Sequence, residues 1–344
     1  MQPGKCNVSN TMRIIRFFLI YMILIASFAN LFGQDASFSQ FYVNPMYLNP
    51  ALTGNTECGR LHLQYRNQWP SLNKAYVTYN VAYDQSLPGI NSGFGFMVLR
   101  DQQGSGAYNR TMVGGLYSYK LQVSYNSYIN FGVKAAFYQE SIDWSKLIFA
   151  DMINSATGVV SFPGAEARPD KPTIYQADFA AGLVWGYSDM IFAGFAADHL
   201  TQPEMSFYEN SGEKLHLRYT LHGGLNINAS TGSFGDVRQN EVLIQPNLLF
   251  LQQHTYSQIN AGVYISKAPF VAGFWYKHAK DNADAMSFLI GLKWDNYRIG
   301  YSYDYTVSKL SGKSGGAHEL SFSWDFCIYT NAIRTIRTIN SPTF

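Results

Sequence analysis

Apolar and polar residues alternate with a period of two along most of the chain after residue 60. The pattern is clearest at 215–227, where the odd positions are large and apolar except for Gly223, and the even positions are His, Arg, Thr, Gly and Asn. Similar runs occur at 128–138, 297–305 and 319–326. Successive side chains of a strand point to opposite faces, so each run predicts a strand with one apolar and one polar face.

The runs are about ten residues long, which suits a tilted membrane-crossing strand better than the shorter strands of a soluble sheet. The predicted strands are 61–69, 76–84, 93–101, 109–120, 127–139, 174–185, 190–200, 215–227, 241–252, 258–266, 269–278, 286–294, 296–306 and 317–327. We therefore predict an all-β fold, a transmembrane antiparallel β-barrel of about 14 strands over residues 61–327.

Connection lengths predict how the barrel lies in the membrane. The connections 140–173, 201–214 and 307–316 are long, whereas most of the connections that alternate with this set along the chain are short. With an even number of strands and long outer loops, as in bacterial outer-membrane barrels, both termini are expected to be periplasmic. The connection 228–240 is too long for a periplasmic turn, and Pro246 is unfavourable within the strand that follows.

The stretch from Gln34 to Gly54 predicts neither a helix nor a strand. It contains Asn44-Pro45 and Asn49-Pro50, and each proline disfavours helical backbone in the residue before it and lacks a backbone donor. Its aromatic and aliphatic side chains nevertheless favour burial. We expect residues 34–60 to form a plug-like segment in the barrel lumen; the alternative is a turn-rich lead-in on a surface.

Residues 1–33 have the form of a cleaved export signal, with basic residues ahead of the apolar run 17–32. A membrane anchor is the alternative, but the run is short for one. Cleavage removes three of the 25 basic residues and no acidic ones, which leaves 22 against 23 and a net charge of −1. Such a near-neutral chain offers no electrostatic basis for binding nucleic acid.

Composition supports the β assignment. The chain has 25 Tyr, 24 Phe and 29 Gly, with only 14% charged residues, which is unlike helical proteins. For an exported chain of this kind, an array of soluble β-sandwiches is the alternative to an outer-membrane barrel, and strand length and parity favour the barrel.

Charged side chains of both signs are expected to face the lumen. On the predicted register they are Arg66, Asp84, Lys134, Asp178, Arg218, Lys293, Arg298, Asp304, Glu319 and Asp325. A pore selective for anions or for cations would need a ring of side chains that carry one sign of charge. We therefore expect these charges to pair with each other or to hold a plug, with a solvated polar interior as the alternative.

No catalytic, cofactor or metal site is predicted. The sequence lacks Gly-x-Ser-x-Gly, a phosphate-binding loop and His-Glu-x-x-His, and its seven histidines are scattered. His199, His222 and His318 could each partner a serine, but single histidines on polar strand faces are more often structural. We expect no enzymatic activity.

Three cysteines are too few for a metal cluster, and Cys6 lies in the predicted signal. Cys58 precedes the first predicted strand and Cys327 ends the last, and these strands are antiparallel neighbours in a closed barrel. Both side chains point inward on the predicted register, so a disulfide is possible in the oxidising periplasm. Two unrelated free thiols are the alternative.

Several motifs resemble the PorP/SprF family of Bacteroidetes outer-membrane proteins. The first group lies in the opening stretch: Gln34, Asp35, Phe38, Ser39, Gln40, Asn44, Pro45, Asn49, Pro50, Ala51 and Gly54. The others are Tyr65–Trp69, Asp84, Asp101–Gly104, Tyr117–Tyr119, His199-Leu200, Tyr303-Asp304 and Gly316–Glu319. Two departures are Asp151-Met152, where the family often has Asp-Pro, and a long basic tail at 328–344.

This resemblance implies a non-enzymatic outer-membrane component of type IX secretion and gliding machinery. Such a protein would contact outer-membrane lipid and work with ring and periplasmic subunits, and in some members with a secreted adhesin. The alternative is a plugged transporter for small or hydrophobic molecules, which would need the same polar lumen. The tail 328–344 is either a docking segment or disordered.

Overall fold

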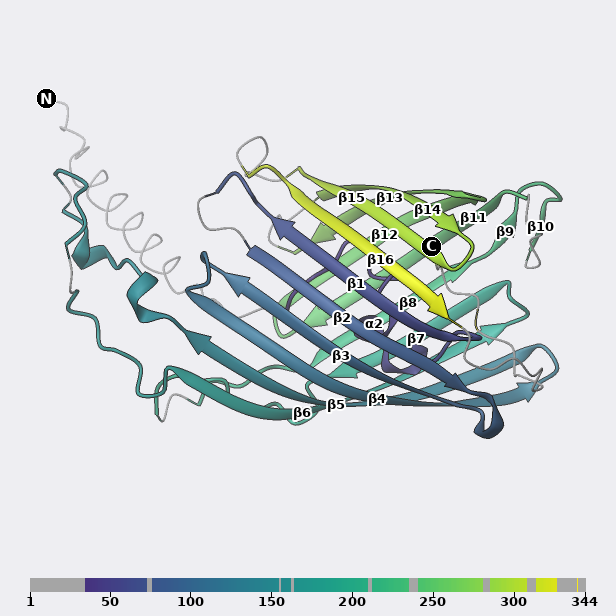
Figure 1. Ribbon diagram of the computed structural model, residues 1–344, viewed down its shortest axis with the longest axis horizontal. Helices are drawn as coiled ribbons and strands as arrows, with labels where there is room; N and C mark the ends of the chain where they lie inside the picture. The colour runs from purple at the N-terminus through teal and green to yellow at the C-terminus, as the bar shows by residue number, and fades with distance from the viewer. Residues whose placement is uncertain are drawn as a thin grey trace, which may run out of the picture. The chain divides into compact units, whose positions relative to one another are not determined.

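Strands β1–β8 and β11–β16 close into an antiparallel barrel of fourteen strands (Figure 1). The ring is complete because β1 pairs with β16 and β8 pairs with β11. The predicted all-β barrel is confirmed, and each predicted strand corresponds to one of these fourteen. None of the helices among the described residues is long and apolar enough to cross a membrane.

The computed structural model describes residues 35–72, 76–154, 156–161, 164–209, 212–234, 241–280, 285–307, 314–326 and 339. The predicted signal, Gln34, Cys327 and all of the tail except Ile339 lie outside these residues. Residues 36–344 belong to one compact unit, which is the unit described here.

The barrel strands are β1 (Gly59–Gln68), β2 (Tyr76–Leu87), β3 (Ser92–Gln103), β4 (Tyr108–Ser124), β5 (Ser127–Ile142), β6 (Thr173–Tyr187), β7 (Ile191–Asp198), β8 (Arg218–Leu225), β11 (Leu243–Gln253), β12 (Tyr256–Lys267), β13 (Phe270–Ala279), β14 (Ala285–Trp294), β15 (Tyr297–Thr306) and β16 (Ala317–Phe326). The helical elements are α2 (Pro45–Leu48), η1 (Pro50–Leu52), η2 (Pro88–Ile90), η3 (Trp144–Lys146) and η4 (Ala150–Met152).

The predicted alternation appears directly in burial. Along β5, Asn130, Lys134 and Ala136 are buried on the inner face, while Val133 and Phe137 are exposed on the outer face. The outer face is therefore apolar and suited to lipid, and the inner face carries the polar and charged side chains.

The two ends of the barrel differ in the length of their connections. At one end, β4 and β5 are joined by 125–126, β12 and β13 by 268–269, and β14 and β15 by 295–296. At the other end, the connections 143–172 and 199–217 are long. The start of β1 meets the end of β16 at Gly59↔Phe326, and Arg60 pairs with Asp84 near the short connection 88–91 between β2 and β3, so both lie at the short-turn end.

The long connection at the short-turn end contains two further strands, β9 (Ile227–Asn228) and β10 (Ser233–Phe234). Strand β11 pairs with β8 up to Asn247↔Gly224 and with β9 from Ile244↔Ile227. Gln245 and Pro246 fall in the interruption between the two pairings. A proline is tolerated there because no ladder bond to that side is required of it.

The barrel seam supports a prediction about the cysteines. Cys58 is disulfide-bonded and directly precedes Gly59, which pairs with Phe326 at the seam, whereas Cys327 lies outside the described residues. We expect a Cys58–Cys327 bond, and its loss in Cys58→Ser should lower stability by about 2–4 kcal/mol. Mass spectrometry of unreduced peptides tests the pairing. Alkylation of both cysteines without prior reduction would contradict it.

Candidate functional site

The described part of the opening stretch lies inside the barrel, where its two Asn-Pro pairs start short helices. Pro45 and Pro50 occupy the first turns of α2 and η1, where the missing N–H costs nothing. Asn49 caps η1, since its Oδ1 accepts a hydrogen bond from Ala51 N at 2.9 Å. Residues 36–55 are called the luminal segment below; the purple ribbon carrying α2 traces part of it (Figure 1).

Apolar side chains of the luminal segment fill the barrel in two clusters. Phe41 and Tyr42 pack against wall residues such as Trp275, with ring centroids of Phe41 and Trp275 4.6 Å apart. Phe38 and Met46 pack against a second group that includes Met97. Each buried aromatic or aliphatic side chain contributes about 1.5–3 kcal/mol, so this packing favours the occupied lumen.

The first turn of the luminal segment is held by a buried carboxylate on β16. Glu319 accepts hydrogen bonds from Ser39 N at 2.7 Å and from Gln40 N at 2.9 Å. Gln64 Nε2 on β1 donates to the same carboxylate at 2.6 Å, and Arg66 Nη1 donates at 3.0 Å. A wall side chain therefore binds the backbone of the segment as well as the neighbouring strand.

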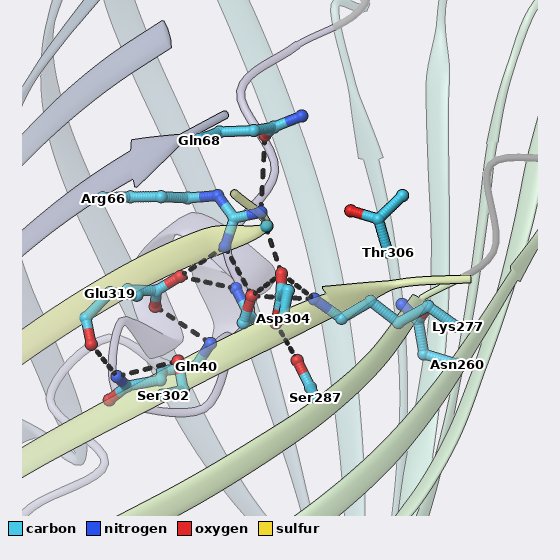
Figure 2. A network of polar contacts seen from close by, with 12 residues as sticks. Gln40, Arg66, Gln68, Asn260, Lys277, Ser287, Ser302, Asp304, Thr306 and Glu319 are labelled. Carbon is cyan, nitrogen blue, oxygen red and sulfur yellow. Dashed lines mark hydrogen bonds and ion pairs between the residues drawn. The ribbon is translucent and has the colours of Figure 1, made fainter. Parts of the chain in front are cut away.

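A second buried carboxylate completes this network. Asp304 on β15 lies 3.0 Å from both Arg66 Nη2 and Lys277 Nζ, and it accepts from Ser39 Oγ at 2.5 Å. Figure 2 shows Arg66 and Lys277 reaching Asp304 from opposite sides. With Glu319, the four charges balance in sign, which is the condition under which buried charges are tolerated. We refer to these four residues, with Ser39 and Gln40, as the anchor network.

The far end of the luminal segment is fixed at Gly54. Gly54 N donates to Asp84 Oδ2 at 2.9 Å, and Asp84 also pairs with Arg60 at 3.2 Å. Gly54 has a φ of +61°, and an added Cβ would lie 2.6 Å from Gly93 Cα. Only glycine meets both conditions.

Tyr47 makes a third attachment. Arg218 Nη1 donates to the Tyr47 hydroxyl at 3.1 Å, and the guanidinium lies 4.9 Å from the Tyr47 ring centroid. Asp198 pairs with both Arg218 at 3.0 Å and Lys134 at 2.6 Å. Attachments on β1–β2, β7–β8 and β15–β16 thus reach the segment from several parts of the wall.

Two wall glycines allow the segment to touch the barrel backbone. A Cβ on Gly132 of β5 would lie 2.2 Å from Ala51 N, and one on Gly182 of β6 would lie 2.0 Å from Asn49 Oδ1. Asn49 Nδ2 lies 3.2 Å from the carbonyls of Leu183 and Phe195. Close backbone approach is the reason for glycine here.

The structure brings most of the predicted site residues together. Ser39 and Gln40 meet Arg66, Asp304 and Glu319, and the remaining pairs are Gly54 with Asp84 and Tyr47 with Arg218. Five other predicted residues of the segment are buried: Phe38, Asn44, Pro45, Asn49 and Pro50. Asp35 directly precedes the segment, and Gln34 lies outside the described residues. Lys293 shares the inward parity of Ser287 and Leu289 on β14, as predicted, and its side chain is exposed near the short-turn end.

Sequence reasoning missed several members of the site. Lys277 has the inward parity of β13, shared with buried Trp275, so the alternation alone could have identified it. Gln64, Ser287, Gly132 and Gly182 also belong to the site. Nothing in the local sequence distinguishes these from other polar or small residues of the wall.

The three histidines considered for catalysis each bond to a wall or segment residue. His199 Nδ1 lies 2.7 Å from Asp178, His222 Nε2 lies 3.1 Å from Asn49 Nδ2, and His318 Nδ1 lies 2.8 Å from the Tyr301 hydroxyl. Among the described residues, no three His, Cys, Asp or Glu side chains are grouped to hold a metal ion.

Comparison with solved structures finds two transporters of similar fold. The toluene transporter TbuX of Ralstonia pickettii is 11% identical with a TM-score of 0.50, covering 82% of this chain and 93% of its own. The P. putida toluene transporter TodX is 10% identical with a TM-score of 0.47, covering 82% and 93%. At 11% identity, the likeness to TbuX supports the fold alone.

No curated protein matches the chain in sequence. The family model described as "Type IX secretion system membrane protein PorP/SprF" matches residues 30–324, which confirms the resemblance seen in the motifs. The family is described as a membrane component of a secretion system. The chain therefore belongs to the PorP/SprF family of type IX secretion system membrane proteins and is an outer-membrane β-barrel.

Proposed function

We propose that this barrel is a non-enzymatic part of the type IX secretion and gliding machinery that binds or retains secreted protein and docks periplasmic subunits. The observation that carries the proposal is the occupied lumen. Attachments at Glu319, Asp84 and Arg218 hold the luminal segment across the interior. A barrel closed in this way is suited to contacts at its two ends rather than to passage through its centre.

The lengths of the connections support one orientation of the barrel in the membrane. The end that carries the start of β1 and the end of β16 has mostly short turns, as periplasmic ends do, which supports a periplasmic position for both termini. The connections 143–172 and 199–217 then face outward and are available to a secreted protein, such as an adhesin. The periplasmic end is available to ring and periplasmic subunits.

Purification from native membranes tests this proposal. The tagged protein is extracted in mild detergent, and copurifying proteins are identified by mass spectrometry, with an unrelated outer-membrane barrel as the control. Enrichment of secretion subunits or of a secreted adhesin is the expected result. A clean barrel that copurifies only with lipid would contradict it.

The alternative is a plugged transporter for small or hydrophobic molecules. The likeness of fold to a toluene transporter is the observation that favours it, but at 11% identity this likeness concerns the barrel alone. Uptake of a labelled hydrophobic compound, lost on deletion of the protein and restored by its return, would support the alternative.

A further inference from the structure

A cavity of about 700 Å³ lies against the outside of the barrel wall at the long-loop end. Its wall side is formed by Val77 of β2, Arg100 and Gln102 of β3, Asn109 of β4 and Ser141 of β5. These positions share the outward parity of their strands, opposite to the buried Thr78, Asp101 and Glu140. The cavity is therefore separate from the lumen and its anchor network.

The outer surface changes from apolar to polar at this cavity. On β3, Phe96 and Val98 are 61% and 44% exposed, and the next outward residues are Arg100 and Gln102. On β4, outward Val113 is followed toward the same end by Thr111 and Asn109. Such a change marks the boundary between lipid tails and headgroups.

The connection that follows β5 covers the cavity. Asp143 N donates to Ala107 O at 2.7 Å, and Ile142 N donates to Pro172 O at 3.0 Å, which fixes both ends of this connection against the barrel rim. The connection contributes Trp144, Lys146 and Arg168 to the lining. Tryptophan is enriched at membrane interfaces because its ring is amphipathic.

Positive charge predominates in the cavity. Arg100, Lys146 and Arg168 line it together with a single acid, Asp143. Lys146 Nζ lies 3.4 Å from Asp143, whereas Arg100 and Arg168 form no ion pair with any described residue. The hydrogen bond from Ser145 keeps the pKa of Asp143 below its ordinary value, so this carboxylate is ionised. Two positive charges remain uncompensated beside the apolar belt.

We propose that this cavity binds the phosphate group of a lipid headgroup whose acyl chains lie along the apolar outer face of β2–β5. Arginine presents several N–H donors to phosphate oxygens in a fixed geometry. Neighbouring Phe96 and Val98 supply the surface for the acyl chains. In the orientation proposed above, the ligand is a phosphorylated glycolipid of the outer leaflet. Only the choice of leaflet rests on that orientation.

Lipid retention in nanodiscs tests the site. The folded mature barrel is reconstituted in phosphatidylcholine, lipid A is added, and bound lipid is counted by native mass spectrometry. Arg100→Gln, Lys146→Gln and Arg168→Gln are combined in one variant. Each cation near a membrane surface contributes enough that we expect retention to fall at least about tenfold. The matched control combines Lys171→Gln, Lys214→Gln and Lys280→Gln, which removes three exposed cations outside the cavity, and should retain lipid normally.

Two further probes identify the ligand. The triple variant at Arg100, Lys146 and Arg168 is called the cavity variant. Dephosphorylated lipid A should bind the unaltered barrel as weakly as phosphorylated lipid A binds this variant. Millimolar inorganic phosphate should not displace the lipid, and displacement would overturn the lipid assignment in favour of a phosphate-ion site. Unchanged retention by the cavity variant would overturn the site itself. Copurification of secretion subunits with the same variant measures the proposed function separately.

Discussion

Replacing Gly132 by leucine should expel the luminal segment from its place against β5. The new Cβ alone would lie 2.2 Å from both Ala51 N and the carbonyl carbon of Pro50, and these are backbone atoms that cannot rotate away. Overpacking of this kind costs about 3 kcal/mol. We expect a matching loss of stability and a rise in single-channel conductance in planar bilayers.

Gly115→Leu is the matched control for this experiment. Gly115 lies on the neighbouring strand β4, pairs with Ala135, and has no atom within 4 Å of an added Cβ. It should change neither stability nor conductance. Deletion of residues 36–55 should raise conductance as Gly132→Leu does. If neither variant conducts more than the unaltered barrel, although both still fold, the luminal segment does not close the lumen.

Glu319→Ala should be the most destabilising single charge removal in the barrel. The substitution removes the acceptor of two backbone N–H groups of the segment and of the Gln64 side chain. Arg66 and Lys277 then have Asp304 as their only carboxylate partner in the anchor network. Breaking a buried pair in this way costs about 3–5 kcal/mol. Denaturant unfolding in lipid vesicles, followed by tryptophan fluorescence, measures the loss.

Glu209→Gln gives the comparison for a solvent-exposed pair. Glu209 lies 3.3 Å from Lys171 with both side chains more than half exposed, so its removal should change stability by less than about 0.5 kcal/mol. Glu319→Gln keeps one carbonyl acceptor and should fall between the two. Equal stability of Glu319→Ala and Glu209→Gln would show that the anchor network does not hold the segment.

The strands could be predicted because lipid and lumen impose opposite demands on successive residues. Along β5, this demand places Lys134 and Val133 on opposite faces, and that difference is visible in the sequence. Pro246 argued against the predicted strand at 241–252, because the sequence does not show that β8 and β9 are interrupted opposite this proline.

The partners within the lumen could not be predicted from alternation. Parity shows that Glu319 faces inward, but not that it meets Ser39 and Gln40, because that contact depends on the stagger of the strands around the ring. The contacts of Gly132 and Gly182 with the luminal segment could not be predicted either. A glycine in a strand can mark a bulge, a bend or a close approach, and only the folded chain distinguishes these cases.

The anchor network joins the start of the folded chain to its last two barrel strands. The luminal segment is synthesised before every strand that binds it, and its contact with Glu319 spans 280 positions of sequence. A growing sheet that lacks β15 and β16 leaves the Ser39 and Gln40 amides without their acceptor and also exposes two open edges. The final hairpin removes both defects in one step, because it brings in Asp304 and Glu319 as it pairs with β1. We therefore expect the ring to seal and the anchor network to form together, and a chain truncated before β15 should keep the attachments at Asp84 and Arg218 but lose those at Ser39 and Gln40.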